Sequence, residues 1–460
     1  MENSLPIKEQ DVELTSGGLW ANIWRMSWPM LLIMLFNFLV GMTDIYIAGF
    51  IGPEVQAAVG FVGQIYFLTI LIANAVSIGT VALLSRAIGA RNLKGALDIA
   101  GQSLAFSVLA ALVLMLAGIV FHGEIISLAG FPAGLREIAK DFLKIFSLAI
   151  GPNYVLIISN AIFRAGGEVR KMLFTMFLVS AVNIALNFIL VFGIPPFFSG
   201  IGYKGIALST AASMVVGMII NFTLLSSGRW KPVFTESLVL HPEIMRNIVD
   251  ISWPAALLQI AWNAGSLVLY NILGRLGSAS ITSLAALTNG LRIEAVIYLP
   301  AFALNMAASV LVGQNLGARN AERAEKVGWK TASAGVVFIS VMALVIFLLA
   351  GRLASFVAKS PGVVEETTRY LRINMLSEPF MALSTVLGGG LQGAGDTRGT
   401  MWVVIIAMWL IRIPLAYLFA LTLGYGAVGV WAAMVTSMTF QGIFMAYRFH
   451  NGLWKRMRIG

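Results

Sequence analysis

The sequence contains no cysteine among its 460 residues. Disulfide bonds, thiolate nucleophiles, iron–sulfur clusters and cysteine-based zinc sites are therefore excluded. Histidine is almost as scarce, because the three present, His122, His241 and His450, lie far apart and near the ends of apolar stretches. Residues so dispersed predict no metal centre, no haem site and no cofactor.

Charged residues are also rare. Only 11% of the residues are Asp, Glu, Lys or Arg, against roughly a quarter in a soluble domain, and the mean hydropathy is +0.86. A bilayer core about 30 Å thick requires roughly 20 largely apolar residues in each spanning helix. The composition therefore predicts an all-α polytopic membrane protein.

The net charge of +10 does not indicate nucleic-acid binding, because the basic residues form short clusters between apolar runs instead of a continuous stripe. Residues 1–23 carry four acids and lack an apolar core, so they do not resemble a cleaved signal peptide. They are expected to form a cytoplasmic tail.

Gly, Pro and charge clusters divide the apolar sequence into twelve predicted transmembrane helices, arranged as two six-helix bundles. The expected helices span residues 24–50, 56–84, 99–121, 138–163, 171–194, 204–227, 246–274, 280–313, 329–350, 368–392, 400–423 and 426–448. The expected organisation is a tail (1–23), an N-lobe (24–227), a cytoplasmic linker (228–245), a C-lobe (246–448) and a basic cytoplasmic tail (449–460).

Lys and Arg in short loops predict the orientation. With the N-terminus inside, 20 of the 31 basic residues fall in inner loops and 8 in outer loops. Both termini are therefore expected to be cytoplasmic.

Four short motifs recur in the same order in both halves, at offsets of 225 to 229 residues. Duplicated membrane halves usually indicate a transporter whose pathway lies between them. Because both halves would have the same orientation, the expected pseudo-twofold axis runs along the membrane normal. The paired motifs are Ser27-Trp28-Pro29 with Ser252-Trp253-Pro254, Gly89-Ala90-Arg91-Asn92 with Gly317-Ala318-Arg319-Asn320, Pro152 with Pro379, and Arg164-Ala165-Gly166-Gly167 with Gly393-Ala394-Gly395-Asp396.

These motifs resemble the multidrug and toxic compound extrusion (MATE) family over nearly the whole chain, from Ser27 to about Arg448. The stretch from Ser27 through Asp44 to Gly52-Pro53-Glu54 is similar to the family's first helix. Gly395-Asp396-Thr397-Arg398 is similar to a family loop. The polar cluster described below places the chain nearest the DinF-like branch.

The resemblance implies a secondary antiporter, not an enzyme, that exports cationic amphipathic compounds in exchange for H⁺ or Na⁺. It also implies a multi-pass protein of the inner (plasma) membrane, and a monomer is expected. One alternative is a flippase for lipid-linked saccharides from the same wider superfamily. Another is a membrane-embedded enzyme, but no clustered His, paired acids or Ser-based site supports it.

Asp44 is the first candidate for the coupling site. A carboxylate inside a spanning helix is costly unless it faces a partner or water, so it is a functional hypothesis by default. The alternative is a solvated Asp near the outer helix end, or one that caps the turn before Gly52.

Asn183 and Asn187 lie four residues apart, on one face of a predicted helix, and Thr210 lies on the next helix. By resemblance, these three residues and Asp44 form the cation-coupling cluster. The position of Asn187 is often a second Asp in the family, and this departure leaves H⁺ and Na⁺ both open. Interhelical hydrogen bonding is the equally weighted alternative.

The C-lobe has Leu269 where the N-lobe has Asp44, so the lobes are not expected to be equivalent. Two acids do lie at membrane depth in this lobe, Glu294 and Glu378. Each is a candidate for contact with a substrate or cation, or for a structural ion pair with Arg412.

Trp262, Tyr298 and Met306 are candidate cleft residues, because aromatic and methionine side chains suit an adaptable, cation-attracting wall. The alternative is that they simply pack or face lipid. Pro29 and Pro254 are expected to bend the first and seventh helices during alternating access, since proline removes a backbone hydrogen bond.

Overall fold

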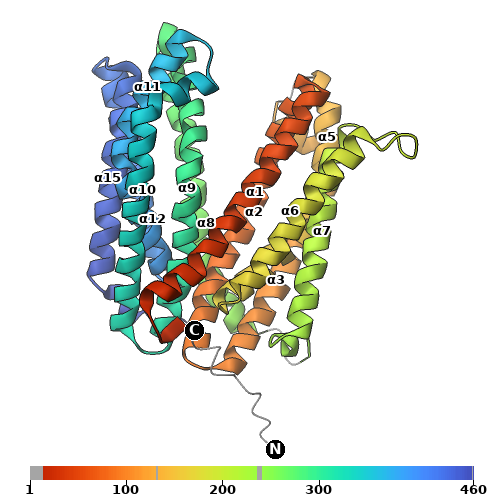
Figure 1. The fold of residues 1–460 in the computed structure, drawn as a ribbon, viewed down its shortest axis with the longest axis vertical. Coiled ribbons are helices and arrows are strands. Elements are labelled where there is room, and N and C mark those ends of the chain that lie inside the picture. Colours follow the sequence, from red (N-terminus) through yellow and green to blue (C-terminus); the bar gives the residue numbers. More distant parts are fainter. Residues whose placement is uncertain (1–13, 131–132, 236–240, 458, 460) are drawn as a thin grey trace, which may run out of the picture. The chain divides into compact units, whose positions relative to one another are not determined.

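The structure, a computed structural model, describes residues 14–130, 133–235, 241–457 and 459. This described part is helical almost throughout, and eleven of its helices are long and apolar enough to cross a membrane (Figure 1). The chain divides into two compact units. We call residues 32–252 the N-unit, and residues 14–31 with 253–459 the C-unit.

The N-unit is a helical bundle in which α5 packs against α2, α3 and α7, and α7 also packs against α6. A short helix and two 3₁₀ turns, Ala133–Leu135 and Lys231–Phe234, lie in its connections. Its helices are the later part of α1 (Leu19–Ile51), α2 (Pro53–Gly89), α3 (Leu93–Val120), α4 (His122–Leu128), α5 (Arg136–Ala165), α6 (Val169–Phe192), α7 (Lys204–Ser227) and the start of α8 (Pro242–Gly274).

The C-unit is a second bundle, in which α12 packs against α9, α10 and α15. It also contains the start of α1 and the later part of α8. Its other helices are α9 (Ser280–Gly317), α10 (Ala321–Val357), α11 (Pro361–Asn374), α12 (Glu378–Gly393), α13 (Thr397–Ile405), α14 (Ile413–Tyr417) and α15 (Gly426–His450).

The boundaries between the units fall inside α1 and α8, after Leu31 and after Ser252. Pro29 and Pro254 lie within two residues of these boundaries. Each removes one backbone donor from its helix, so α1 and α8 are weakened next to the boundary. The expected helix bends and the expected lobe limits, 24–227 and 246–448, stay predictions.

The expected single helix over 368–392 is wrong. Helix α11 begins earlier, at Pro361, and ends at Asn374, after which a 3₁₀ turn, Met375–Ser377, leads into α12. In a continuous α-helix, the ring of Pro379 would clash with the carbonyl of Met375 four residues before it. The chain avoids this clash by tightening into the 3₁₀ turn.

The helix expected over 400–423 is also irregular. Two π-helical turns, Ile406–Arg412 and Leu418–Thr422, flank the short helix α14. Such turns are rare and occur frequently at functional sites. The first of them ends at Arg412.

The internal repeat is confirmed by the backbone geometry of matching loops. Arg91 and Arg319 both adopt a left-handed conformation with φ of 57°. The next residue in each loop caps the following helix: the Asn92 carbonyl oxygen Oδ1 accepts from Gly95 N–H, and Asn320 Oδ1 accepts from Arg323 N–H, both at 3.0 Å. The two halves therefore share a loop conformation as well as a short sequence.

Two glycines of α12, Gly389 and Gly393, allow this helix to pack closely against α9. A Cβ atom on Gly389 would collide with the backbone oxygen of Asn305, and one on Gly393 with that of Ser309. Both contacted residues lie on α9. Small residues at such interfaces bring membrane helices into close contact.

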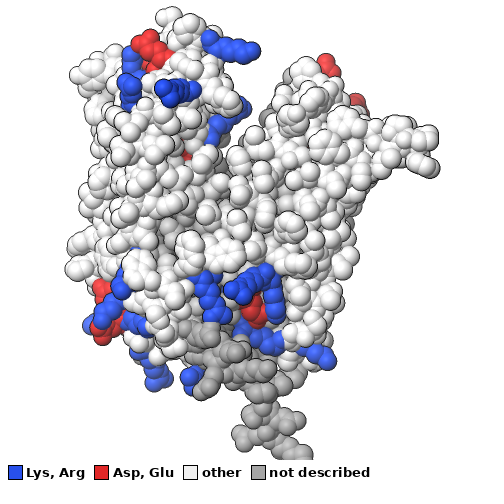
Figure 2. Space-filling model, viewed as in Figure 1, with Lys and Arg blue, Asp and Glu red and all other residues white. Residues whose placement is uncertain are grey.

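Charged side chains gather at the helix ends of each unit. Figure 2 shows Lys, Arg, Asp and Glu near these ends, with largely uncharged surface along the helix middles. This distribution is expected of helices that cross a hydrocarbon layer.

The described end of the N-terminal segment is attached to the C-unit. Arg323 donates to the backbone oxygens of Ser16 and Gly17 at 2.7 and 2.9 Å. Asn22 donates to Ser16 as well, at 2.9 Å. The expected 1–23 tail lies mostly outside the described residues, and the part described is folded.

Asp396 stabilises the loop Gly395-Asp396-Thr397-Arg398. Its carboxylate accepts Gly399 N–H as the N-cap of α13 and forms two hydrogen bonds with the Arg448 guanidinium, at 2.6 and 2.8 Å. A bidentate pair of this kind is both strong and directional. It ties the start of α13 to the end of α15.

We predict that Asp396→Ala destabilises the protein by about 3 kcal/mol, because it leaves a partly buried guanidinium without its carboxylate. Thermal unfolding of the purified protein in detergent measures the effect. Asp396→Asn is the control, since its Oδ1 can still cap α13 while the ion pair is lost. Equal midpoints for wild type and Asp396→Ala would contradict the prediction.

Candidate functional site

Asp44 lies in the N-unit at the junction of α1, α6 and α7, where two side chains donate to its carboxylate. Asn187 Nδ2 donates to Oδ1 at 2.7 Å, and Thr210 Oγ1 donates to Oδ2 at 3.1 Å. Both donors lie on other helices. The structure therefore places Asp44 inside a polar cluster and not in the turn before Gly52.

Asn183 completes the cluster. Its Nδ2 donates to Thr210 Oγ1 at 3.2 Å, and its Oδ1 accepts from Asn187 Nδ2 at 3.1 Å. Asn183, Asn187 and Thr210 are buried. The structure thus brings together all four residues that the sequence suggested, in a closed ring of hydrogen bonds.

In this ring the Asp44 carboxylate accepts both of its hydrogen bonds, one from Asn187 and one from Thr210. An ionised carboxylate can only accept hydrogen bonds, so the arrangement matches the charged form of Asp44. In this ring, Asn187 Oδ1 has no hydrogen-bond partner among the described residues, and Asn187 has 0% exposure. Burying an oxygen without a hydrogen bond reduces the stability of the fold. Asn187 Oδ1 can therefore accept a hydrogen bond if the side chains of the cluster rearrange.

Apolar packing fixes the position of Asp44. Ile47 and Ala48, on the next turn of α1, are buried in a core with Val55 of α2 and Ile206 of α7. Ile206 lies one turn before Thr210 on the same helix. The core therefore sets the register between the carboxylate and its hydroxyl donor.

A second polar cluster lies in the C-unit, around a cavity of about 160 Å³. The sequence suggested Trp262, Glu294, Glu378 and Tyr298 as cleft residues, and all four line it. Arg412 lines it as well. Met306 is half-buried and lies outside this lining.

The two acids of the cavity are almost fully buried, with exposures of 2% for Glu294 and 3% for Glu378. Tyr298 donates to Glu294 Oε2 at 3.3 Å. Glu294 Oε1 and Glu378 Oε2 have no hydrogen-bond partner in the described part of the chain, although the Tyr370 hydroxyl lies beside the Glu294 carboxylate. Two carboxylates far apart in the sequence thus face one cavity with incomplete hydrogen bonding.

Arg412 is held by other groups. Its Nε donates to Ser437 Oγ at 2.7 Å, and its guanidinium carbon lies 4.8 Å from the centroid of the Trp262 ring. Within the part of the chain that the structure describes, Arg412 has no carboxylate oxygen within 4.0 Å. The expected ion pair with either acid is therefore absent there, and Arg292, the nearest arginine in sequence to Glu294, is exposed.

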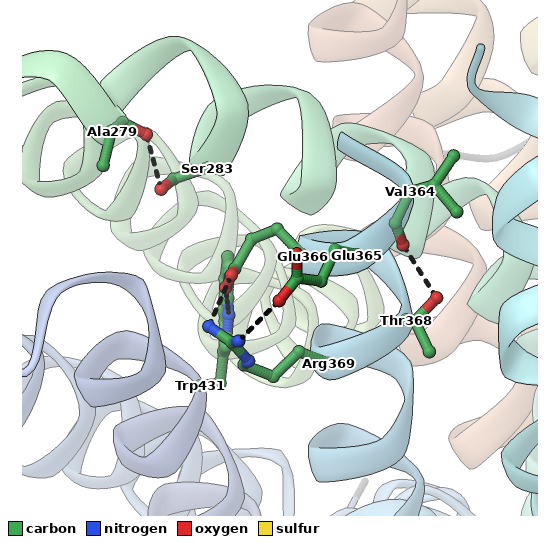
Figure 3. Close-up of polar contacts among 8 residues, drawn as sticks. All are labelled: Ala279, Ser283, Val364, Glu365, Glu366, Thr368, Arg369 and Trp431. Atoms are coloured by element: carbon green, nitrogen blue, oxygen red, sulfur yellow. Dashed lines mark hydrogen bonds and ion pairs between the residues drawn. The ribbon is translucent and has the colours of Figure 1, made fainter. Parts of the chain in front are cut away.

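Glu366, Arg369 and Trp431 form a polar clamp between α11 and α15, two helices that line this cavity (Figure 3). Glu366 accepts from Trp431 Nε1 at 2.8 Å and pairs with Arg369 at 3.0 Å. One turn later, the Tyr370 ring packs edge-on against Trp431, with centroids 4.7 Å apart. The clamp holds α11 against α15. It therefore also positions the 3₁₀ turn that follows α11 and leads to Glu378.

Several residues of the cavity were missed from the sequence. Asn374 and Ser377 line it, next to the break between α11 and α12, and Ser437 holds Arg412. A proline after an intramembrane acid was a signal for the break. Nothing in the sequence pointed to Ser437. Leu269, at the position that matches Asp44, contributes an apolar wall.

No group of three or more His, Cys, Asp or Glu side chains that could hold a metal ion occurs among residues 14–130, 133–235, 241–457 and 459. Among these residues, the oxygen atoms of the Asp44 cluster and the Glu294 and Glu378 carboxylates are the candidates for a cation.

A family model described as MatE matches residues 29–189 and 254–418, one match in each repeat. The "Uncharacterized transporter YisQ" of Bacillus subtilis (strain 168) is 23% identical over 94% of each chain. The "Probable multidrug resistance protein NorM" of Thermotoga maritima is 24% identical, over 95% of this chain and 93% of its own.

Among solved structures, the "outward-facing conformation of a multidrug resistance MATE family transporter of the MOP superfamily" is similar, with a TM-score of 0.89. It is 22% identical, over 97% of this chain and 99% of its own. This likeness establishes the twelve-helix fold, in which α11 and α12 together take the place of one spanning helix.

We predict that Gly290→Ala distorts the cavity wall, because a Cβ at this position on α9 would collide with the Tyr370 ring. Overpacking of this kind costs about 1–3 kcal/mol. Thermal unfolding measures the loss. Gly351→Ala is the matched control, since nothing lies within 4 Å of its added Cβ. Equal loss in both variants would contradict the proposed contact.

Proposed function

Because the chain belongs to the MatE family, a family of drug and toxin antiporters, we propose that it exports small cationic amphipathic compounds in exchange for protons taken up at Asp44. It is a multi-pass membrane transporter and not an enzyme. The observation that carries the proton assignment is the ring of donors around Asp44.

Protonation of Asp44 would rearrange this ring. A neutral carboxyl group carries one hydrogen to donate. Asn187 presents only an amide donor to Oδ1, whereas the Thr210 hydroxyl at Oδ2 can rotate and accept the new hydrogen. The nearby unpartnered acceptor is Asn187 Oδ1. Rotation of the Thr210 hydroxyl accommodates the proton without turning either amide, so proton uptake changes the hydrogen bonds between α1 and α7.

Sodium requires a larger change. Na⁺ needs oxygen ligands, but the Asn187 group that faces Asp44 is its amide nitrogen. Turning Asn187 alone would place its oxygen against Asn183 Oδ1, which now accepts from Asn187. Both amides would have to turn together before Na⁺ could bind. The structure in its present state therefore favours H⁺ as the coupling ion.

The cavity around Glu294 and Glu378 supports a cationic substrate. Two buried carboxylates with unpartnered oxygens make a region of negative charge, and Trp262 and Tyr298 add aromatic surface. Aromatic faces and carboxylates together suit organic cations. We therefore assign the C-unit cavity to the cationic group of the substrate.

Alternating access couples the two sites in this proposal. Each of α1 and α8 contributes to both units, and Pro29 and Pro254 lie beside the points where the units divide. Proton uptake at Asp44 would change the packing of α1 and favour the state that releases substrate outside. The protein acts as a monomer in the inner membrane, with both termini cytoplasmic, and is nearest the DinF-like branch.

We predict that Asp44→Asn abolishes gradient-driven export of ethidium, because the amide cannot bind and release a proton. Ethidium efflux from proteoliposomes, under an imposed pH gradient in sodium-free buffer or an imposed sodium gradient at constant pH, measures it. Wild type should respond to the pH gradient.

Glu124→Gln removes an exposed acid from the short helix α4 and should transport like wild type. Full exchange by Asp44→Asn would overturn the role of Asp44. Transport driven only by sodium would replace H⁺ with Na⁺ as the coupling ion.

A further inference from the structure

We infer that Arg412 limits the C-unit cavity to ligands with a single positive charge. The inference rests on the proposed function, because it concerns the site assigned to the cationic group of the substrate. Arg412 would act as a fixed internal charge that sets which substrates the cavity accepts. It is a specificity-determining residue and not the counter-ion of one acid.

The charges that line the cavity do not balance. Its lining includes Glu294, Glu378 and Arg412, and no other Asp, Glu, Lys or Arg among the described residues. With both acids ionised, these three groups leave one negative charge. A buried uncompensated charge is costly, so the cavity is balanced by one more positive charge, which either a proton on one of the two acids or a cationic ligand can supply.

The positions of the acid oxygens support the same count. Glu294 Oε1 and Glu378 Oε2 are buried and have no hydrogen-bond partner among the residues that the structure describes, although the Tyr370 hydroxyl lies beside the Glu294 carboxylate. Arg412 does not satisfy them, because no carboxylate oxygen of either acid lies within 4.0 Å of it among the described residues. Glu378 Oε2 therefore remains available to a ligand, and a ligand at Glu294 would lie beside the Tyr370 hydroxyl.

The side chain of Arg412 is held in place by its neighbours, so a ligand does not displace it. It is 4% exposed, it donates to Ser437, and its guanidinium covers the face of Trp262. The π-helical turn that ends at Arg412 directs it into the bundle. Its charge stays in the cavity when a ligand binds.

The size and walls of the cavity indicate the ligand class. A cavity of about 150 Å³ accepts a benzene-sized group, and this one measures about 160 Å³. Tyr270, Met434 and Met438 add aromatic and thioether surface to the lining. Carboxylates with such walls suit a compact quaternary ammonium group. A second charge on that group would be repelled by Arg412 at short range in a medium of low dielectric constant.

Two probes of nearly equal shape test the charge limit. 1,1,4,4-Tetramethylpiperidinium carries one charge, and 1,1,4,4-tetramethylpiperazinium carries two on a ring of the same size with the same four methyl groups. Binding to the purified protein is measured by calorimetry. Wild type should bind the monocation in preference to the dication. In Arg412→Gln, the affinity for the dication relative to the monocation should rise by on the order of tenfold or more.

Arg412→Lys is the matched control, because it keeps the charge while losing the planar guanidinium. It should keep the preference of wild type for the monocation. An unchanged preference in a folded Arg412→Gln protein, or a dication preference in Arg412→Lys, would overturn the inference. Failure of wild type to bind the monocation would overturn it as well.

A charge-compensating pair keeps the test decisive if one substitution perturbs folding. Glu378→Gln should lose monocation binding, because one acid and Arg412 leave no net charge in the cavity. Glu378→Gln combined with Arg412→Gln restores one negative charge and should recover binding. A merely structural role for either residue predicts greater damage in the double variant, and that result would contradict the inference.

These measurements need no ion gradient, so they are separable from the proposed function. Monocation binding with the expected charge preference, but without gradient-driven export, would leave the inference standing and remove the antiport proposal. Export that depends on Asp44, with no change of charge preference in Arg412→Gln, would do the reverse.

Discussion

A carboxylate buried between membrane helices must receive hydrogen bonds or a compensating charge, and this requirement organises both polar clusters of the protein. Asp44 meets it with donors from α6 and α7. Asp396, in a loop, meets it with an arginine and a helix N-terminus. Glu294 and Glu378 meet it only in part, since each keeps an unpartnered oxygen. The first and third cases can change with the binding of a proton or cation, whereas the second is complete and structural.

The two repeats share their loops but not their polar sites. Arg91 and Arg319 have the same left-handed backbone, while Leu269 replaces Asp44 as an apolar wall of the C-unit cavity. The duplicated scaffold thus carries two different polar clusters, to which we assign, as a proposal, the coupling ion and the substrate cation. Because α1 and α8 each belong to both units, a change at one site has a direct covalent route to the other unit.

Much of this was predictable from the sequence, for physical reasons. Asn183 and Asn187 lie four residues apart and so share a helix face. Polar side chains at membrane depth form hydrogen bonds between helices, so contact between these residues and Asp44 was predictable. The position of Glu294 and Glu378 around one cavity was not predictable from the sequence, because it depends on how α9 packs against α12. The break before Glu378 was missed although Asn374, Ser377 and Pro379 interrupt the apolar sequence there, because proline also occurs inside continuous helices such as α1 and α8. The partner of Arg412 was also missed, since a single serine on α15 carries no pattern.

The most direct test of the central claim is proton release on substrate binding, measured in weakly buffered, sodium-free detergent solution. If one proton and the substrate favour opposite states of the transporter, each must weaken the binding of the other. Binding of ethidium should then release protons from the wild-type protein and none from Asp44→Asn. Equal release from both proteins would show that the linked proton lies elsewhere, and the assignment of Asp44 as the coupling site would be wrong.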